Sequence, residues 1–301
     1  MRHSQLIHPS IQKLTAALSL LASSLYLQAQ VAEPPTLTHD HADIGIAFAE
    51  GSWDLHVHDG ASDTEYEPSA VWLEVGPHAL NPIPGSSAFA FLGEPGTPSW
   101  ILPETDNHDL LFLGLGTEEI EPGTFQDDSV TLTLLNLTGP GHFALYQTDP
   151  FGNPVVRMNS ADGITEEDHI QLATGGHAHA NWAFSAPGQY RITLQASATL
   201  AADGQPTTSD AAEYLFTVSD QPVLTITPKD NATCSVSWMS LPGHNYQLQT
   251  LLNLGDNSWI NLTENPITGT GRLLSFDVSR SPATRFLRLE VQEAGNESPA
   301  P

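Results

Sequence analysis

The histidines of this chain are the residues best suited to chemistry. Its 301 residues include 13 histidines, against 9 lysines and arginines together. Neutral imidazole is the protein ligand that Zn²⁺ and Cu²⁺ bind most often. Six of the histidines form three His-x-His pairs, namely His39 with His41, His56 with His58, and His177 with His179. These pairs predict a transition-metal site.

The spacing within each pair suits a β-strand. Residues i and i+2 of a strand point to the same face, with Cα atoms about 6–7 Å apart. Residues 53–59 read Trp-Asp-Leu-His-Val-His-Asp, which predicts a strand with its three apolar residues toward the core. His56 and His58 then share the opposite face and can converge on one ion. Asp43 and Asp59 are candidates to complete or orient such a site.

Other interpretations of the polar residues stay open. A His-x-His pair on a polar strand face is commonly solvated and binds no metal. Two acidic loops offer oxygen ligands of the kind that Ca²⁺ prefers. Neither loop has the spacing of a calcium-binding hand, so calcium ranks below zinc and copper. The loops contain Asp59, Asp63, Glu65 and Glu67 in one case and Asp162, Glu166, Glu167 and Asp168 in the other.

Enzymatic motifs are incomplete. Residues 39–43 match the start of the metallo-β-lactamase pattern His-x-His-x-Asp-His, but Ile44 stands where the last histidine is required. That fold also needs helices, and no segment after residue 30 has a helical period. The sequence contains no Gly-x-Ser-x-Gly and no glycine-rich phosphate loop. A non-enzymatic protein is therefore predicted, with a metal-dependent hydrolase as the third-ranked alternative.

The charge balance excludes several classes of partner. The chain carries 35 acidic residues and a formal net charge of −26, and no lysine or arginine occurs between Lys13 and Arg157. Such a surface repels the phosphates of nucleic acids and the headgroups of anionic membranes. It attracts cations instead, which suits a metal site.

The first 30 residues predict an exported protein. Arg2 and Lys13 precede an apolar run over residues 14–27, as in a secretory signal peptide. The run is too short to span a bilayer, so we expect no transmembrane anchor. A periplasmic, cell-surface or released location follows. Cys234 is the only cysteine, so stability must come from a core or a bound ion rather than from disulfides.

Short alternating segments predict an all-β chain. They fit half-buried strands with a period of two, and they favour a β-sandwich domain followed by a smaller fibronectin-like β-sandwich. We expect a signal peptide at 1–30, domains at 36–220 and 222–292, and a disordered tail at 293–301. The clearest strand segments are 70–75, 129–135, 190–196 and 214–218.

Eight segments of the sequence form a familiar succession. They are residues 43–45, 55–59, 91–93, 100–103, 112–114, 139–145, 159–163 and 176–184. Taken in order, they resemble the choice-of-anchor M domain, also called the actinobacterial surface-anchored repeat domain. Members of that family are secreted or surface-anchored, and some accompany the substrate-binding component of a metal-type ABC transporter. The resemblance therefore implies a receptor role and, as a partner, a metal-transporter substrate-binding protein.

Carried over residue by residue, the resemblance selects one set of metal ligands. His39 lies outside the family pattern. The sortase motif or membrane tail that anchors family members has no counterpart in this sequence. The selected residues are His41, Asp43, His56, His58, His177 and His179. Residues 222–290 resemble, more weakly, the small β-sandwich modules that end secreted proteins of Verrucomicrobia and Planctomycetes. Trp238, Tyr246, Trp259 and Phe286 are interpreted as the core of that module.

The leading hypothesis is thus a secreted, non-enzymatic protein that binds a divalent transition metal. Zinc is the first candidate and copper the second. The main alternative is a surface or matrix interaction protein whose histidines are structural. The sequence leaves open whether the ion is structural or transported, and what the C-terminal module does.

Overall fold

The structure is a computed structural model that describes residues 34–253, 255, 258–280 and 286–293. The predicted signal peptide and most of the predicted tail lie outside these residues. The regular secondary structure of the described part is almost entirely β-strand. Its short 3-10 helices are η1 (Pro68–Ala70), η2 (Pro77–Ala79), η3 (Ser87–Leu92) and η4 (Gln126–Asp128).

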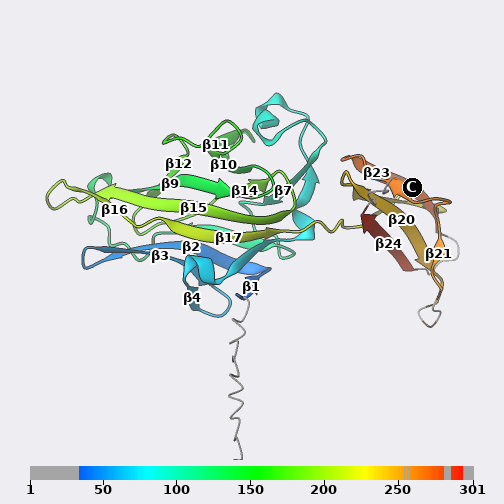
Figure 1. The fold of residues 1–301 in the computed structure, drawn as a ribbon, viewed down its shortest axis with the longest axis horizontal. Coiled ribbons are helices and arrows are strands. Elements are labelled where there is room, and N and C mark those ends of the chain that lie inside the picture. Colours follow the sequence, from blue (N-terminus) through cyan, green and yellow to red (C-terminus); the bar gives the residue numbers. More distant parts are fainter. Residues whose placement is uncertain (1–33, 254, 256–257, 281–285, 294–301) are drawn as a thin grey trace, which may run out of the picture. The chain divides into compact units, whose positions relative to one another are not determined.

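Three sheets make up residues 36–218 (Figure 1). The β15 sheet has the order β1 (Thr36–Leu37), β5 (Trp72–Val75), β17 (Ala212–Val218), β15 (Gly188–Thr199), β9 (Ser129–Thr138) and β12 (His169–Ala173), and β16 (Pro206–Thr208) pairs with β15. The β10 sheet runs β11 (Pro154–Asn159), β10 (Phe143–Thr148), β14 (Asn181–Phe184), β7 (Pro98–Leu102) and β6 (Leu80–Pro82). The β2 sheet runs β13 (His177–His179), β8 (Leu111–Gly116), β2 (Asp40–Ala49), β3 (Ser52–Asp59) and β4 (Thr64–Tyr66).

The three sheets share one apolar core. Trp182 of the β10 sheet lies 5.6 Å from Phe216 of the β15 sheet, measured between ring centroids. On the β2 sheet, Trp53 donates a hydrogen bond to Thr207 of β16 at 3.0 Å. The β2 and β10 sheets therefore both pack against the β15 sheet, as a β-sandwich requires.

The predicted alternation is confirmed in the long strands. In β15 the side chains of Tyr190, Ile192 and Leu194 are fully buried, while the residues between them are not. The segment at residues 70–75 begins differently from the prediction. Pro68 opens the short helix η1, which extends to Ala70 and delays the strand to Trp72. Proline fixes its φ near the helical value, so it suits the first turn of such a helix.

The C-terminal strands form two further sheets with a core of their own. One runs β18 (Thr225–Pro228), β19 (Thr233–Met239) and β23 (Leu273–Ser279); the other runs β21 (Ile260–Asn261), β20 (His244–Leu251) and β22 (Ile267–Thr268), with β24 (Phe286–Glu293) paired to β20. Trp238 and Tyr246 lie in this core, as predicted. Trp259 is only half-buried, and the Arg288 guanidinium covers its ring at 4.3 Å. The boundary at residues 220–222 stays a prediction.

Two buried phenols should make the fold sensitive to alkali. Burial raises the pKa of Tyr146 and of Tyr190 to about 12, against an ordinary value of about 10. Their neutral forms therefore stabilise the fold below about pH 10, and this contribution is lost as the pH rises through about 12. We expect an ultraviolet absorbance titration to show two phenols ionising near pH 12 in the folded protein. Tyr190→Phe should remove one of them; a single transition near pH 10 would contradict the prediction.

Candidate metal centre

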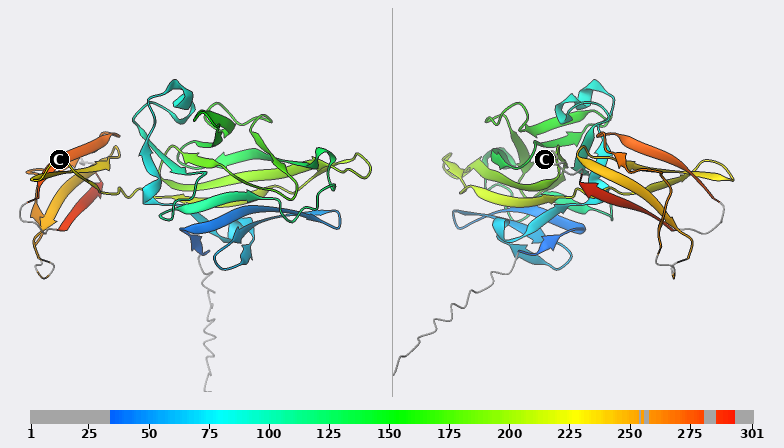
Figure 2. Two further views of the ribbon diagram at one scale, coloured as in Figure 1. Left: turned by 180° about the vertical axis from the view of Figure 1, so that it is seen from behind. Right: turned by 45° about the vertical axis from the view of Figure 1, so that its right-hand side comes forward.

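The strand register of the β2 sheet places the predicted ligands on one face. His179 pairs with Gly114, Gly114 with Asp43, and Asp43 with His58. The next row contains His177, Gly116, Gly45 and His56. Directly paired residues project to the same side of a sheet, so both rows share the outer face. In Figure 2 the blue strands β2 and β3 run along one side of the sandwich.

Three imidazoles and one carboxylate converge on this face, and we call them the His41 cluster: His41, Asp43, His177 and His179. The Nε2 atoms of His177 and His179 are 3.1 Å apart. Asp43 Oδ1 lies 3.2 Å from His177 Nε2 and 3.5 Å from His41 Nε2. One nitrogen of each histidine lies within 4.8 Å of the others. Three imidazole nitrogens thus converge, and the Asp43 carboxylate lies beside two of them.

Gly114 provides the room for this convergence. A Cβ atom at residue 114 would lie 2.1 Å from Asp43 Oδ1 and 2.7 Å from His177 Nε2. Both distances are shorter than any normal contact, so the cluster occupies space that every other residue type would fill. The glycines in the Leu-Gly-Leu-Gly end of β8 therefore leave space on the sheet surface for the donor atoms.

Neighbouring groups orient the rings. Glu118 Oε1 lies 2.5 Å from His177 Nδ1, which directs the Nε2 atom of that ring toward Asp43. The ring of Phe112 stacks on His179 at 3.8 Å with an interplanar angle of 4°. Carboxylate partners of this kind fix the tautomer of metal-binding histidines and raise their basicity. The cluster therefore has the supporting contacts of a built site.

A buried threonine holds the loop that carries Glu118. Thr117 Oγ1 donates to the carbonyl oxygen of Ala173 at 2.5 Å, and the carbonyl oxygen of Gly176 lies 3.0 Å from the same hydroxyl. The same hydroxyl accepts a hydrogen bond from the Gly176 backbone nitrogen at 3.1 Å. These bonds join the end of β8 to the start of β13, and so fix Glu118 beside His177.

Burial shapes the ionisation of the cluster. It raises the pKa of the Asp43 carboxyl above its ordinary value, while His41 and His177 act in the opposite direction. Burial also lowers the pKa of His179, helped by the like charges of His177 and His41 and opposed by the Leu113 backbone. A neutral imidazole keeps the lone pair that a metal ion needs.

A second group lies beside the first. His56, Glu65 and Glu119 each offer one ligand atom within 4.8 Å of the others, and we call them the His56 cluster. Residues of both clusters line one hollow with a volume of about 350 Å³. The six predicted ligands therefore do not meet at one point.

The remaining predicted residues have other neighbours. His58 lines the same hollow, but its Nε2 atom lies 3.3 Å from Asp63 Oδ1. His39 precedes β2 and contacts Asp40. The sequence prediction did not include Glu118, Glu119 or Gly114. One available signal was the acidic pair Glu118–Glu119, which follows an apolar strand after a single threonine.

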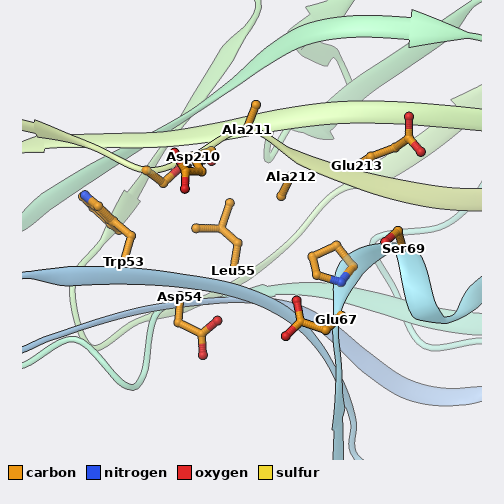
Figure 3. Close-up of a pocket in the computed structure, with 11 residues that line it drawn as sticks. Trp53, Asp54, Leu55, Glu67, Ser69, Asp210, Ala211, Ala212 and Glu213 are labelled. Atoms are coloured by element: carbon orange, nitrogen blue, oxygen red, sulfur yellow. Dashed lines mark hydrogen bonds between the residues drawn. The ribbon is translucent and has the colours of Figure 1, made fainter.

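Another hollow, of about 310 Å³, lies between β3, η1 and β17. Its lining includes four acidic residues but no histidine. Figure 3 shows the carboxylates of Asp54 and Glu213 pointing in opposite directions, away from Leu55 and Ala212. Among the described residues, the groups with ligand atoms within 4.8 Å of one another are the His41 and His56 groups, and none of their members lines this hollow.

Among the described residues, no helix has the length and apolar character needed to cross a membrane. Comparison with protein-family models and with curated proteins gave no match to this chain.

Proposed function

We propose that this protein binds a divalent transition-metal ion, zinc first, through the His41 cluster. One observation carries the proposal. A tetrahedral zinc ion with bonds of about 2.0–2.1 Å places its ligand atoms roughly 3.3 Å apart. The separations between Asp43 Oδ1, His41 Nε2, His177 Nε2 and His179 Nε2 include values of 3.1, 3.2 and 3.5 Å. The three imidazoles, which lie within 4.8 Å of one another, would therefore bind one ion, and Asp43 is the neighbouring carboxylate that could complete its coordination.

The donor types favour zinc over the other ions considered. Three imidazoles and one carboxylate suit zinc, and imidazole also suits copper. Calcium prefers six to eight oxygen ligands, and the His41 cluster offers a single carboxylate. The net charge of −26 further favours the approach of any cation.

The number of ligands favours binding over hydrolysis. Catalytic zinc sites keep one coordination position open for water or substrate, whereas four protein ligands close a tetrahedral site. With Asp43 as the fourth ligand, the ion is held rather than exposed for chemistry. We therefore rank a metal-binding protein above a metal-dependent hydrolase.

We also propose an extracytoplasmic role, either as a receptor that passes metal to a transporter or as a holder of a structural ion. The signal-like residues 1–30 and the family resemblance support this role. The rival function is surface or matrix interaction, in which the histidines serve only structure. Metal binding itself separates the two functions, because purely structural histidines require no ion.

The test is zinc titration of untagged, metal-stripped protein in competition with a chromophoric chelator. We expect tight zinc binding by the wild type and a loss of affinity of at least ~100-fold in the double variant His41→Ala/His177→Ala, because two of four ligands are removed. Zinc should also raise the melting temperature, since a ligand at 100 times its Kd stabilises by about 2.7 kcal/mol.

The matched control is His108→Ala/His142→Ala, which removes two exposed histidines from outside the hollow. It should bind zinc as the wild type does. Equal affinities in the wild type and the His41/His177 variant would overturn the proposal and favour the rival with structural histidines.

A further inference from the structure

The His56 imidazole is buried although it lies on the outer face of the β2 sheet. The residue is 5% exposed. Its ring lies over Gly45, where an added Cβ would come within 2.1 Å of His56 Nε2. Gly45 thus makes room for His56 on β2, as Gly114 does for the His41 cluster on β8.

This ring lacks the hydrogen bonds that buried histidines normally have. His56 Nδ1 makes no hydrogen bond within the described part of the chain, and its nearest carboxylate oxygen, on Asp54, is 3.9 Å away. That separation is beyond hydrogen-bond range. Burial of an unpaired ring nitrogen costs stability, so an interaction of the other nitrogen, Nε2, is expected to offset this cost.

The opposite ring nitrogen faces two carboxylates. Glu119 Oε1 lies 3.3 Å from His56 Nε2, and Glu65 completes a group whose ligand atoms lie within 4.8 Å of one another. The carboxylates come from separate segments, one from β4 and one from the turn after β8. Two carboxylates held this close repel each other unless a cation lies between them.

We propose that His56, Glu65 and Glu119 form a second divalent-cation site, distinct from the His41 cluster. Gly45 and Gly114 are diagonal neighbours on adjacent strands, which puts their Cα atoms on the order of 8 Å apart. The ligand atoms of the two clusters also form two separate groups, so we assign one ion to each. The second site depends on its own three residues and does not require the first ion.

The donor set defines how this ion is held. One imidazole and two exposed carboxylates leave coordination positions for water, and carboxylates also suit Mn²⁺ and other hard ions. Fewer protein ligands and a nearby first ion both weaken the second site. The hollow should therefore hold one tight ion and one weaker, exchangeable ion.

Calorimetric titration of the metal-stripped full chain with Zn²⁺ tests this proposal. We expect two binding events in the wild type, separated by at least about 10-fold in Kd. Glu65→Gln/Glu119→Gln should abolish the weaker event and leave the tight one. Gly45→Ala should do the same without removing a ligand or a charge, because the new Cβ displaces His56.

The control Asp63→Asn/Glu67→Gln removes two negative charges from the same β3–β4 region without touching the cluster. It should retain both events. A wild type with one event that the Glu65/Glu119 variant preserves would overturn the second site alone. Loss of the weaker event in the control would also overturn it, because nonspecific charge attraction would then explain the binding.

The experiments can contradict either metal site independently of the other. His41→Ala/His177→Ala should lose the tight event and retain the weak one, whereas a wild type that binds no zinc would contradict both sites. Thermal unfolding of each metal-free variant, expected within about 3 °C of the wild type, confirms that the titrations compare folded proteins.

Discussion

Replacing Gly114 with alanine is expected to lower the zinc affinity of the His41 cluster by on the order of 100-fold. The new Cβ would lie 2.1 Å from Asp43 Oδ1 and 2.7 Å from His177 Nε2, so two ligands must move away from the common point. Disturbing an orienting neighbour of a metal ligand costs about 10–100-fold in affinity. Direct displacement of two ligands should reach the upper end of that range.

This substitution removes no donor atom and no charge, which makes it a test of geometry alone. Competition titration with a chelator gives the affinity. The control is Gly85→Ala, because a Cβ at residue 85 would meet nothing within 4 Å. Gly85→Ala should bind zinc normally. Zinc affinity in Gly114→Ala within a factor of about 3 of the wild type would mean that the converging atoms do not form the metal site.

The local parts of this structure could be predicted from sequence. Alternating apolar residues identify strands such as β15, because the period of two follows directly from strand geometry. The same rule correctly predicted that Leu55 and Val57 face the core while His56 and His58 face outward. These inferences need only neighbouring residues.

The long-range parts could not be predicted in the same way. The parallel pairing of β2 with β8 sets Asp43 against Gly114, about 70 residues further along the chain. Strand register depends on the whole hydrophobic pattern, so nothing local indicates which imidazoles meet. The sequence prediction therefore put all six candidates in one site, whereas the structure separates His56 from the His41 cluster.

The sequence prediction missed the roles of Glu118, Gly45 and Gly114 for a related reason. A glycine in a strand indicates a bulge or a close approach, but the approaching group is identified only by the partner strands. Glu118 faces His177 because Thr117 ties two distant loops together. These contacts connect distant segments, and the sequence of neither segment indicates that it contacts the other.

Asp43→Asn should have effects of opposite sign on the metal-free and zinc-bound proteins. In the metal-free protein, Asp43 is 7% exposed and its Oδ1 atom makes no hydrogen bond within the described residues. Removing a poorly compensated buried charge should stabilise the fold by about 1 kcal/mol. For a domain of this size, that corresponds to a rise in melting temperature of about 2–4 °C.

In the zinc-bound protein, the same change replaces an anionic ligand with a neutral amide. We expect a loss of about 10–100-fold in affinity, equivalent to about 1.4–2.7 kcal/mol. The shift in melting temperature caused by saturating zinc should therefore be smaller than in the wild type. Asp63→Asn removes an exposed charge nearby and should change neither quantity. If Asp43→Asn instead destabilises the metal-free protein and leaves zinc affinity unchanged, Asp43 serves the fold through its contacts with His41 and His177 and is not a ligand.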